Sequence, residues 1–320
     1  MAFQARAVGG AKAAVPIPEG TPDHDGEMPS VPFDFFASPP REIGKLISAR
    51  SSLRMGRISL PQIAWVGISC LVGIAAFRLA YASGVRYQLE PEQCKRAGIL
   101  FGALGAACMF LFSLRFRPTC SFVGENGVAV ATMRGRRNNP PKIRTLVFNN
   151  AAELRAYQVN QRLFHYAINW CTRYKYVWND FGGKMIFQLK GDYEADIGAL
   201  PKSSSPFHLA RMAEIAWSQI LFDRANHCLK EEGSIPFQID SKRLVRVGPG
   251  FIEFHFGGDP VRVTKDDIAK VTLGGGTFSF QHKDAKWFSR QGKFSFPYGQ
   301  MANAKVFLFA LDKLMGYRWE

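Results

Sequence analysis

The sequence predicts a two-helix transmembrane hairpin followed by an α+β region. Two observations predict the hairpin: residues 58–77 and residues 97–114 are two long apolar runs without a charged side chain. As α-helices, runs of this length span about 30 Å, which is the thickness of the hydrocarbon layer of a membrane. A third observation predicts the α+β region, because after residue 117 the apolar residues follow first the period of strands and then that of a helix.

Charges beside the two apolar runs give the hairpin an orientation. Basic side chains precede the first run and follow the second, and an excess of Lys and Arg marks cytoplasmic segments. Both termini are therefore expected in the cytoplasm. The alternative is a buried helical hairpin within a large globular domain. The flanking residues are Arg41, Lys45, Arg50, Arg54, Arg57, Arg115 and Arg117.

Small residues in the second apolar run predict close helix packing. Gly98, Gly102 and Ala106 recur every four positions, so they share one face of a helix and allow another helix to approach. That helix is either the first run of the same chain or a helix of a second copy. Residues 58–116 are thus expected to form the hairpin.

The chain before the hairpin is predicted to lack a core of its own. Residues 1–40 are rich in Pro, Gly and small side chains, which favours a disordered cytoplasmic tail. Its one apolar cluster, residues 32–36, docks on a partner, docks on the body of the protein, or simply belongs to the tail. Residues 41–57 are expected to be a basic juxtamembrane segment.

The clearest strand pattern lies in residues 242–297. Ile252, Phe254 and Phe256 alternate with polar residues, which places them on one face of a strand, and glycine-containing turns separate the runs. From Met301 onwards the apolar residues recur with helical spacing, so an amphipathic helix is expected to close this unit.

A weaker copy of the same pattern precedes it. Several strands are expected within residues 121–189, and Pro206 and Gly233 bracket a predicted helix. Strands followed by one helix, twice in succession, indicate a duplicated domain. We therefore expect two domains, residues 117–232 and residues 233–320.

This order of elements resembles that of bacterial pleckstrin-homology-like domains, which occur in poorly characterised membrane-anchored proteins. The resemblance rests on residues 235–318, where short strands, among them the Trp-bearing run 286–289, precede one helix. It implies two such domains, each a bent antiparallel sheet capped by a C-terminal helix, in an integral protein of a bacterial inner membrane. It brings no catalytic motif.

No residue pattern predicts an enzyme. Gly274–Thr277 precedes a strand pattern, whereas a phosphate-binding loop needs a following helix, so a turn is expected. Glu253 and His255 share a strand face and could form a metal or proton-transfer set with His282, but no further ligand has diagnostic spacing. Ordinary solvent-facing residues are the alternative. We expect no catalytic residue, no cofactor and no metal.

Basic residues are the candidate contacts for lipid headgroups. The chain has a net charge of +15, and anionic headgroups attract such a protein. Nucleic acid is not expected, because no nucleic-acid-binding motif is present. The alternative for both groups is a solvated basic face. The candidates are Arg115, Arg117, Arg134, Arg136 and Arg137 near the second apolar run, and Lys242, Arg243 and Arg246 in the second domain.

These features favour a binding function. We expect a membrane-anchored, non-enzymatic adaptor or scaffold whose two domains bind a protein partner at the cytoplasmic membrane face. The alternatives are a sensor of anionic lipid headgroups and an accessory subunit of a larger membrane complex. The expected partners are the lipid bilayer, anionic lipid and a protein.

Overall fold

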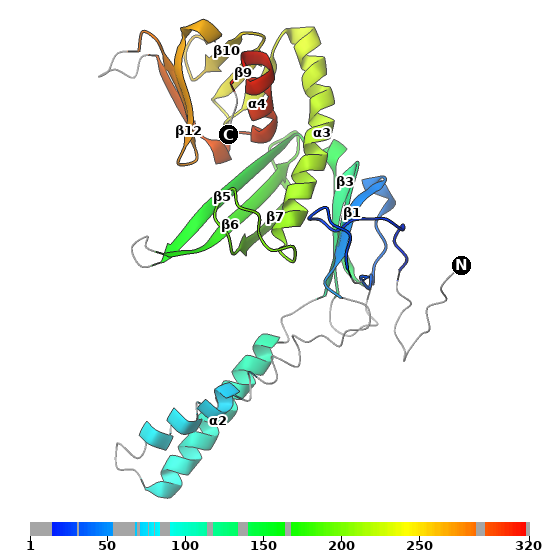
Figure 1. The fold of residues 1–320 in the computed structure, drawn as a ribbon, viewed down its shortest axis with the longest axis vertical. Helices are drawn as coiled ribbons and strands as arrows, with labels where there is room; N and C mark the ends of the chain where they lie inside the picture. Colours follow the sequence, from blue (N-terminus) through cyan, green and yellow to red (C-terminus); the bar gives the residue numbers. More distant parts are fainter. Residues whose placement is uncertain are drawn as a thin grey trace.

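Four antiparallel sheets dominate the computed structural model (Figure 1). The structure describes residues 15–30, 32–53, 68, 71–75, 77–79, 81–83, 90–113, 118–133, 140–163, 168–285 and 292–317. Along this chain one arrangement occurs twice: a four-stranded sheet, then a three-stranded sheet, then a helix.

In the first half, the strand orders are β1-β2-β3-β4 and β5-β6-β7. The helix α3 (Phe207–Glu232) follows them. A further helix, α2 (Pro91–Ser113), lies in the sequence between β1 and β2. The strands are β1 (Leu46–Ser51), β2 (Thr119–Gly124), β3 (Gly127–Thr132), β4 (Lys142–Val147), β5 (Glu153–Leu163), β6 (Ile168–Asn179) and β7 (Met185–Tyr193), with the short helices η1 (Arg41–Ile43) and η2 (Phe148–Asn150).

In the second half, the strand orders are β11-β10-β9-β8 and β12-β13-β14. The helix α4 (Ala304–Ala310) closes this half and continues as the π-helical turn η5 (Leu311–Met315). The strands are β8 (Ile235–Gln238), β9 (Leu244–Gly248), β10 (Phe251–His255), β11 (Val261–Thr264), β12 (Ile268–Gly274), β13 (Thr277–His282) and β14 (Lys293–Pro297), with the short helices η3 (Lys265–Asp267) and η4 (Tyr298–Gln300).

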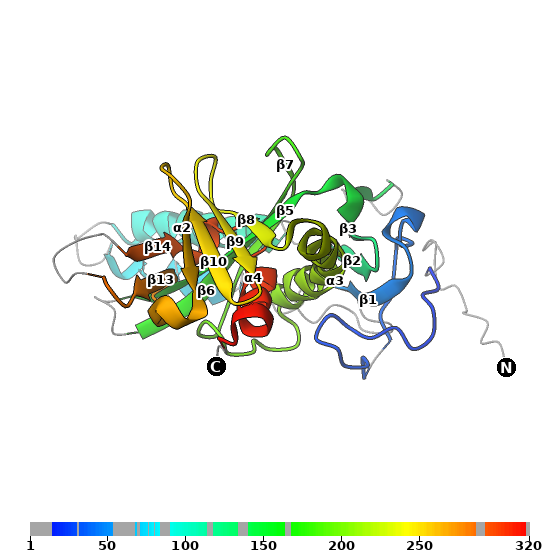
Figure 2. The ribbon, with the colours of Figure 1, turned by 90° about the horizontal axis from the view of Figure 1, so that it is seen from above.

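Helix α3 is the element that connects the sheets. Pro206 directly precedes it, and Gly233 ends it in the left-handed conformation with its N–H bonded to the carbonyl of Leu229. The helix contacts β2, β3, β7, β8 and α4. Figure 2 shows it between the sheet that contains β1 to β3 and the sheet that contains β8 to β10. Its Trp217 is fully buried, with its ring centroid 5.5 Å from that of Phe148. Burial of such large aromatic rings supplies much of the stability of a core.

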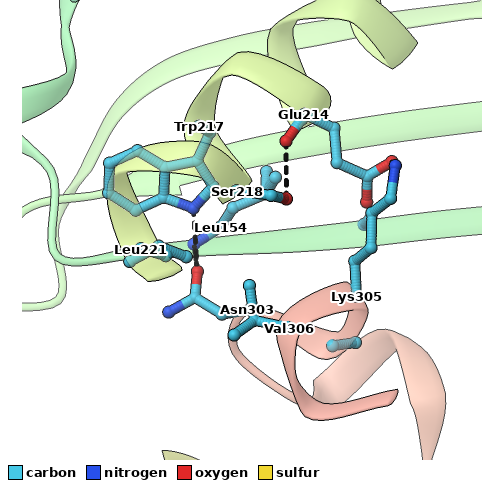
Figure 3. A pocket seen from close by; sticks show the side chains of 10 residues that line it. Leu154, Glu214, Trp217, Ser218, Leu221, Asn303, Lys305 and Val306 are labelled. Carbon is cyan, nitrogen blue, oxygen red and sulfur yellow. Dashed lines mark hydrogen bonds and ion pairs between the residues drawn. The ribbon is translucent and has the colours of Figure 1, made fainter. Parts of the chain in front are cut away.

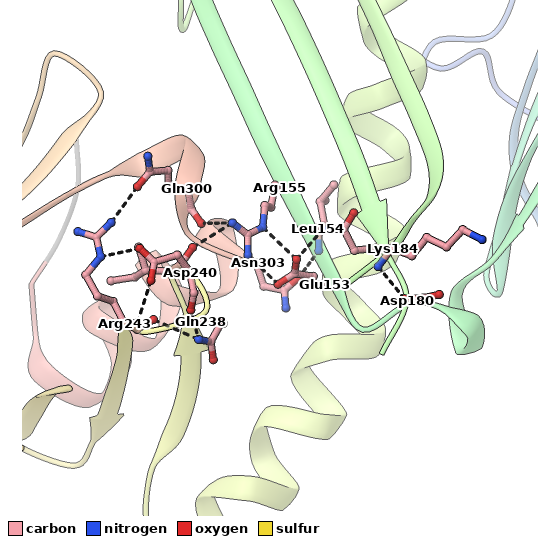
Figure 4. A network of polar contacts seen from close by, with 12 residues as sticks. Glu153, Leu154, Arg155, Asp180, Lys184, Gln238, Asp240, Arg243, Gln300 and Asn303 are labelled. Atoms are coloured by element: carbon pink, nitrogen blue, oxygen red, sulfur yellow. Dashed lines mark hydrogen bonds and ion pairs between the residues drawn. The ribbon is translucent and has the colours of Figure 1, made fainter. Parts of the chain in front are cut away.

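Polar contacts join the two halves (Figure 4). Arg155 on β5 donates from Nη1 to the carbonyl oxygens of Ile239 (2.9 Å) and Gln300 (3.0 Å). Asn303, directly before α4, bonds the backbone of Leu154 in both directions, since its Oδ1 accepts from that N–H (2.9 Å) and its own N–H donates to that carbonyl (2.7 Å). The start of α4 is thereby fixed against β5.

The predicted transmembrane hairpin is contradicted, and the fold class built on it is wrong. Within the described residues, no helix is both long and apolar enough to cross a bilayer. Before α2 the structure describes only short helical pieces, so no two-helix hairpin is seen there. Helix α2 begins with the polar run PEQCKR, so its first turns carry the charged side chains of Glu92, Lys95 and Arg96.

The same finding overturns the expected location. An integral protein of a bacterial inner membrane with both termini in the cytoplasm requires spanning helices, and the described residues contain none that qualifies. The membrane orientation predicted from the flanking basic residues falls with the hairpin, because it presupposed two spanning helices. The Trp-bearing run 286–289, which supported the family resemblance, lies outside the described residues.

The chain before α2 differs from the expected tail and juxtamembrane segment. Strand β1 pairs with β2, with Ala49 opposite Phe122. Phe35 is 7% exposed, its ring stacks on that of Phe122 at 5.8 Å, and its carbonyl accepts the N–H of Val15 (2.8 Å). The aromatic cluster at residues 32–36 thus supplies apolar contacts that composition alone did not reveal. Together with Val15, Ile17 and Ile43, its phenylalanines pack on the sheet formed by β1 to β4.

Candidate functional site

An open pocket of about 220 Å³ lies against the sheet formed by β5, β6 and β7, where the segment that leads from β7 to α3 also lines it. We call it the tyrosine pocket. Three strands, the connecting segment, α3 and the start of α4 contribute to its wall. The residues that line it are Gln158, Tyr176, Tyr193, Gly198, Ala199, Leu200, Phe207, Arg211, Glu214 and Lys305.

The inner wall of the tyrosine pocket is aromatic and carries hydroxyl and amide groups. The ring of Tyr193 packs against that of Phe207 in a tilted arrangement, with ring centroids 4.4 Å apart. The hydroxyl of Tyr193 donates to Oε1 of Gln158 (3.1 Å), and Nε2 of the same amide donates to the hydroxyl of Tyr176 (3.3 Å). Because Tyr176 accepts this bond, its own O–H remains a donor. Burial raises the pKa of Tyr176, so the phenol stays protonated at neutral pH.

One carboxylate lies inside the pocket. The side chain of Glu214 on α3 is 13% exposed, and its Oε2 lies 3.9 Å from Nζ of Lys305 on α4. Burial raises the pKa of Glu214, and the positive charges of Lys305 and Arg211 oppose that rise. The pair is longer than a hydrogen-bonded ion pair of about 2.8 Å, so the contact is loose.

A second, narrower pocket adjoins the first, and Glu214 and Lys305 line both. Figure 3 shows these two side chains facing each other from α3 and α4. Beside them Nε1 of Trp217 donates to Oδ1 of Asn303 (2.9 Å). Since Asn303 also bonds β5, the position of Lys305 two residues later is fixed by the fold rather than by its own ion pair.

Hydrogen bonds hold the segment between β7 and α3 near both of its ends. The hydroxyl of Thr172 donates to the carbonyl of Ala195 (2.5 Å), and Nε2 of His208 bonds the carbonyl of Lys202 (3.1 Å). Nε2 must carry the proton there, because both of its neighbours are carbonyl oxygens, and His208 Nδ1 is left without a partner within the described chain. Between these ties, Leu200 forms an apolar rim and is 69% exposed.

The mouth of the pocket is positively charged. Arg211 is exposed and Lys305 is 45% exposed, whereas Glu214 lies deeper. The phenol of Tyr176 and the amide of Gln158 line the same pocket. Such an arrangement can hold an anionic group at the mouth and offer it hydrogen-bond donors inside.

Comparison of the sequence with models of known protein families and with curated proteins gives no match. The geometry of the site therefore carries the functional argument.

The basic residues predicted to contact lipid differ in their surroundings. Nε of Arg243 bonds Asp240 (2.6 Å) and Nη2 of Arg246 bonds Glu232 (3.0 Å), so both are engaged within the protein. Lys242 is exposed. The other predicted contacts, Arg115, Arg117, Arg134, Arg136 and Arg137, lie outside the described residues.

The small residues of the second apolar run lie on α2. A Cβ added at Gly98 would lie 2.9 Å from the ring of Phe77, and one added at Gly102 would lie 3.0 Å from the carbonyl oxygen of Gly73. The preceding helical pieces therefore approach α2 closely at these two positions. The side chain of Ala106 lies outside the described part.

Of the three residues considered for metal binding or proton transfer, Glu253 and His255 contact each other, whereas His282 pairs with a different carboxylate. Glu253 accepts from Nε2 of His255 (2.7 Å) and also pairs with Arg262 (2.9 Å), whereas His282 lies near Asp284 (3.6 Å). No metal-holding group of His, Cys, Asp and Glu occurs among the described residues. Gly275 and Gly276 form the turn between β12 and β13.

The sequence arguments missed the tyrosine pocket. One signal was available, because Glu214 lies at helical spacing from Ala210, Trp217 and Leu221, all of them buried. A carboxylate in such a row marks a buried charge. The other lining residues come from separate strands, so only strand pairing brings them together.

Proposed function

We propose that this chain is a non-enzymatic adaptor that binds an acidic segment of a partner protein at the tyrosine pocket. The observation that carries the proposal is the pair of exposed cations, Arg211 and Lys305, at the mouth of a pocket lined with hydrogen-bond donors. A carboxylate group fits this arrangement, because charge-assisted hydrogen bonds from cations and phenols are the strong ones.

The size of the pocket supports a protein side chain rather than a separate small molecule. At about 220 Å³ it lies below the range of about 300 to 1,000 Å³ that is usual for small-molecule sites. The exposed apolar rim at Leu200 offers further contact area for the chain that carries the side chain.

The overall charge supports an acidic partner. The chain carries 41 Lys and Arg against 26 Asp and Glu. Complementary charge steers encounter and disfavours partners of the same sign. An anionic lipid has weaker support, since Arg243 and Arg246 already have carboxylate partners within the protein.

Binding of a short acidic peptide to the full chain tests the proposal. The peptide is an acetylated, amidated tetraglutamate with a fluorescent label, and its tetraglutamine counterpart is the matched ligand control. We expect the double variant Arg211→Glu and Lys305→Glu to bind at least about tenfold more weakly. The double variant Lys184→Glu and Lys190→Glu changes the net charge equally at exposed sites outside the pocket and should stay within about twofold.

Two results would overturn the proposal. One is equal affinity for the tetraglutamate and tetraglutamine peptides. The other is an equal loss of affinity in the pocket variant and the control variant, which would indicate general attraction rather than a site.

A further inference from the structure

We propose that the tyrosine pocket binds one carboxylate of the acidic partner by exchange: Lys305 leaves Glu214 for the incoming carboxylate, and Glu214 takes up one proton from solvent. The inference rests on the proposed function and adds a chemical mechanism to it. It predicts that partner binding is coupled to protonation of the protein.

The first step is the exchange of the ion-pair partner. The 3.9 Å between Lys305 Nζ and Glu214 Oε2 is near the outer limit of an ion pair. Lys305 is 45% exposed and Glu214 is 13% exposed, so a ligand arriving from solvent meets the lysine first. A lysine ammonium on its flexible stem can turn to a new partner without movement of the helix.

The second step is protonation of Glu214. When a second carboxylate enters beside it, like charges share one site, and this raises the pKa of the more deeply buried group. Glu214 already has its pKa raised by burial, with Lys305 the largest opposing influence. Removal of Lys305 from Glu214 takes that opposition away. The protonated group can then donate an O–H to the bound carboxylate.

The other groups around Glu214 do not compete for this proton. Arg211 on the same helix contributes a positive charge that opposes protonation of Glu214. Burial raises the pKa values of Tyr176 on β6, Tyr193 on β7 and Tyr298 on η4, so these phenols remain neutral. The loop residues that line the pocket, Gly198, Ala199 and Leu200, carry no ionisable side chain.

The sign of the pH dependence follows from the exchange. Because the complex holds one more proton than the free protein, affinity rises as pH falls, by up to about tenfold per pH unit between the pKa of Glu214 in the free protein and its pKa in the complex. At pH values above the pKa of Glu214 in both states, Glu214 stays ionised and repels the carboxylate of the partner.

Calorimetric titration of the full chain with the tetraglutamate peptide tests the exchange. Measured at one pH in Pipes and in Tris, two buffers with different ionisation enthalpies, the heats should differ as expected for uptake of up to one proton per bound peptide. The variant Glu214→Gln is the neutral isostere, and we expect it to bind at least as tightly as the wild type at pH 7.5 without proton uptake.

The outcomes separate this inference from the proposed function. Peptide binding that depends on Arg211 and Lys305 but takes up no proton leaves the function standing and overturns the exchange. Absence of peptide binding overturns both. If Glu214→Gln does not fold, Lys305→Met replaces it: reduced affinity and reduced proton uptake are expected, and wild-type values for both would contradict the exchange. Inorganic phosphate serves as a second probe, and binding as tight as that of the peptide would contradict a carboxylate ligand.

Discussion

At the scale of single residues, Asn303 holds the junction between the two halves. Its Oδ1 accepts from the N–H of Leu154 and from Nε1 of Trp217, each at 2.9 Å. Its backbone has a φ of 56°, in the left-handed region that Asn tolerates better than most residues. One side chain therefore satisfies two donors and fits an unusual backbone conformation.

Replacement of Asn303 tests both roles. Asn303→Ala leaves the two donors unsatisfied and strains the backbone, so we expect a loss of about 3 kcal/mol in the free energy of unfolding, measured in urea. Asn303→Gly loses the same bonds without the strain and should be about 1 kcal/mol more stable than the alanine variant. Wild-type stability of the glycine variant would show that the two bonds contribute nothing.

His24 links stability to pH. It is 2% exposed, with Nδ1 2.8 Å from Oγ of Ser48 and Nε2 2.8 Å from Oγ of Ser121. Burial lowers the pKa of His24 to about 3. The unfolded chain titrates near the ordinary value of about 6.5, so the contribution of the neutral ring is present above that pH and is lost as pH falls from there towards the folded pKa.

The expected effect of His24 is a fall of up to about 2 kcal/mol in the free energy of unfolding between pH 6.5 and pH 5. The variant His24→Asn should show a shallower dependence over the same range, because the titrating group is gone. Equal slopes for the two proteins in urea unfolding would contradict a buried neutral histidine at this position.

At the scale of elements, local sequence patterns predicted a helix or strand correctly where residues beside it mark its ends. Pro206 and Gly233 predicted the helix that the structure places at Phe207–Glu232. Alternation predicted a strand with Ile252 and Phe254 inward, and β10 buries both. The tyrosine pocket was beyond such reasoning, because its residues meet only through pairing of strands that are distant in sequence.

The segment before α2 packs on the protein, although its amino-acid composition predicted a disordered tail. Phe35 contacts Phe122 on β2, and truncation of this ring should cost about 3 kcal/mol in unfolding free energy because it leaves a cavity. Met28 lies in the same segment and is 61% exposed, so Met28→Ala should change stability by less than about 0.5 kcal/mol. Similar small effects of Phe35→Ala and Met28→Ala would contradict docking of this segment.

At the scale of the whole molecule, the error lay in how apolar length was judged. Counting uncharged residues suggested two spanning helices, but α2 begins before the second apolar run and so includes Glu92, Lys95 and Arg96 in its first turns. Net charge is a global property that does not depend on the fold, and a value of +15 is consistent with the acidic partner that we propose. It could not indicate where that partner binds, because the basic residues near Arg243 proved to be engaged with neighbouring carboxylates.

The proposed function requires that an acidic partner binds at the tyrosine pocket. Hydrogen–deuterium exchange of the full chain, with and without saturating tetraglutamate peptide, tests it most directly, because protection from exchange locates the bound ligand. We expect protection to be concentrated in residues 194–214 and 298–305. Protection confined to other surfaces, such as the turn at Lys242, with the pocket segments unchanged, would contradict the claim.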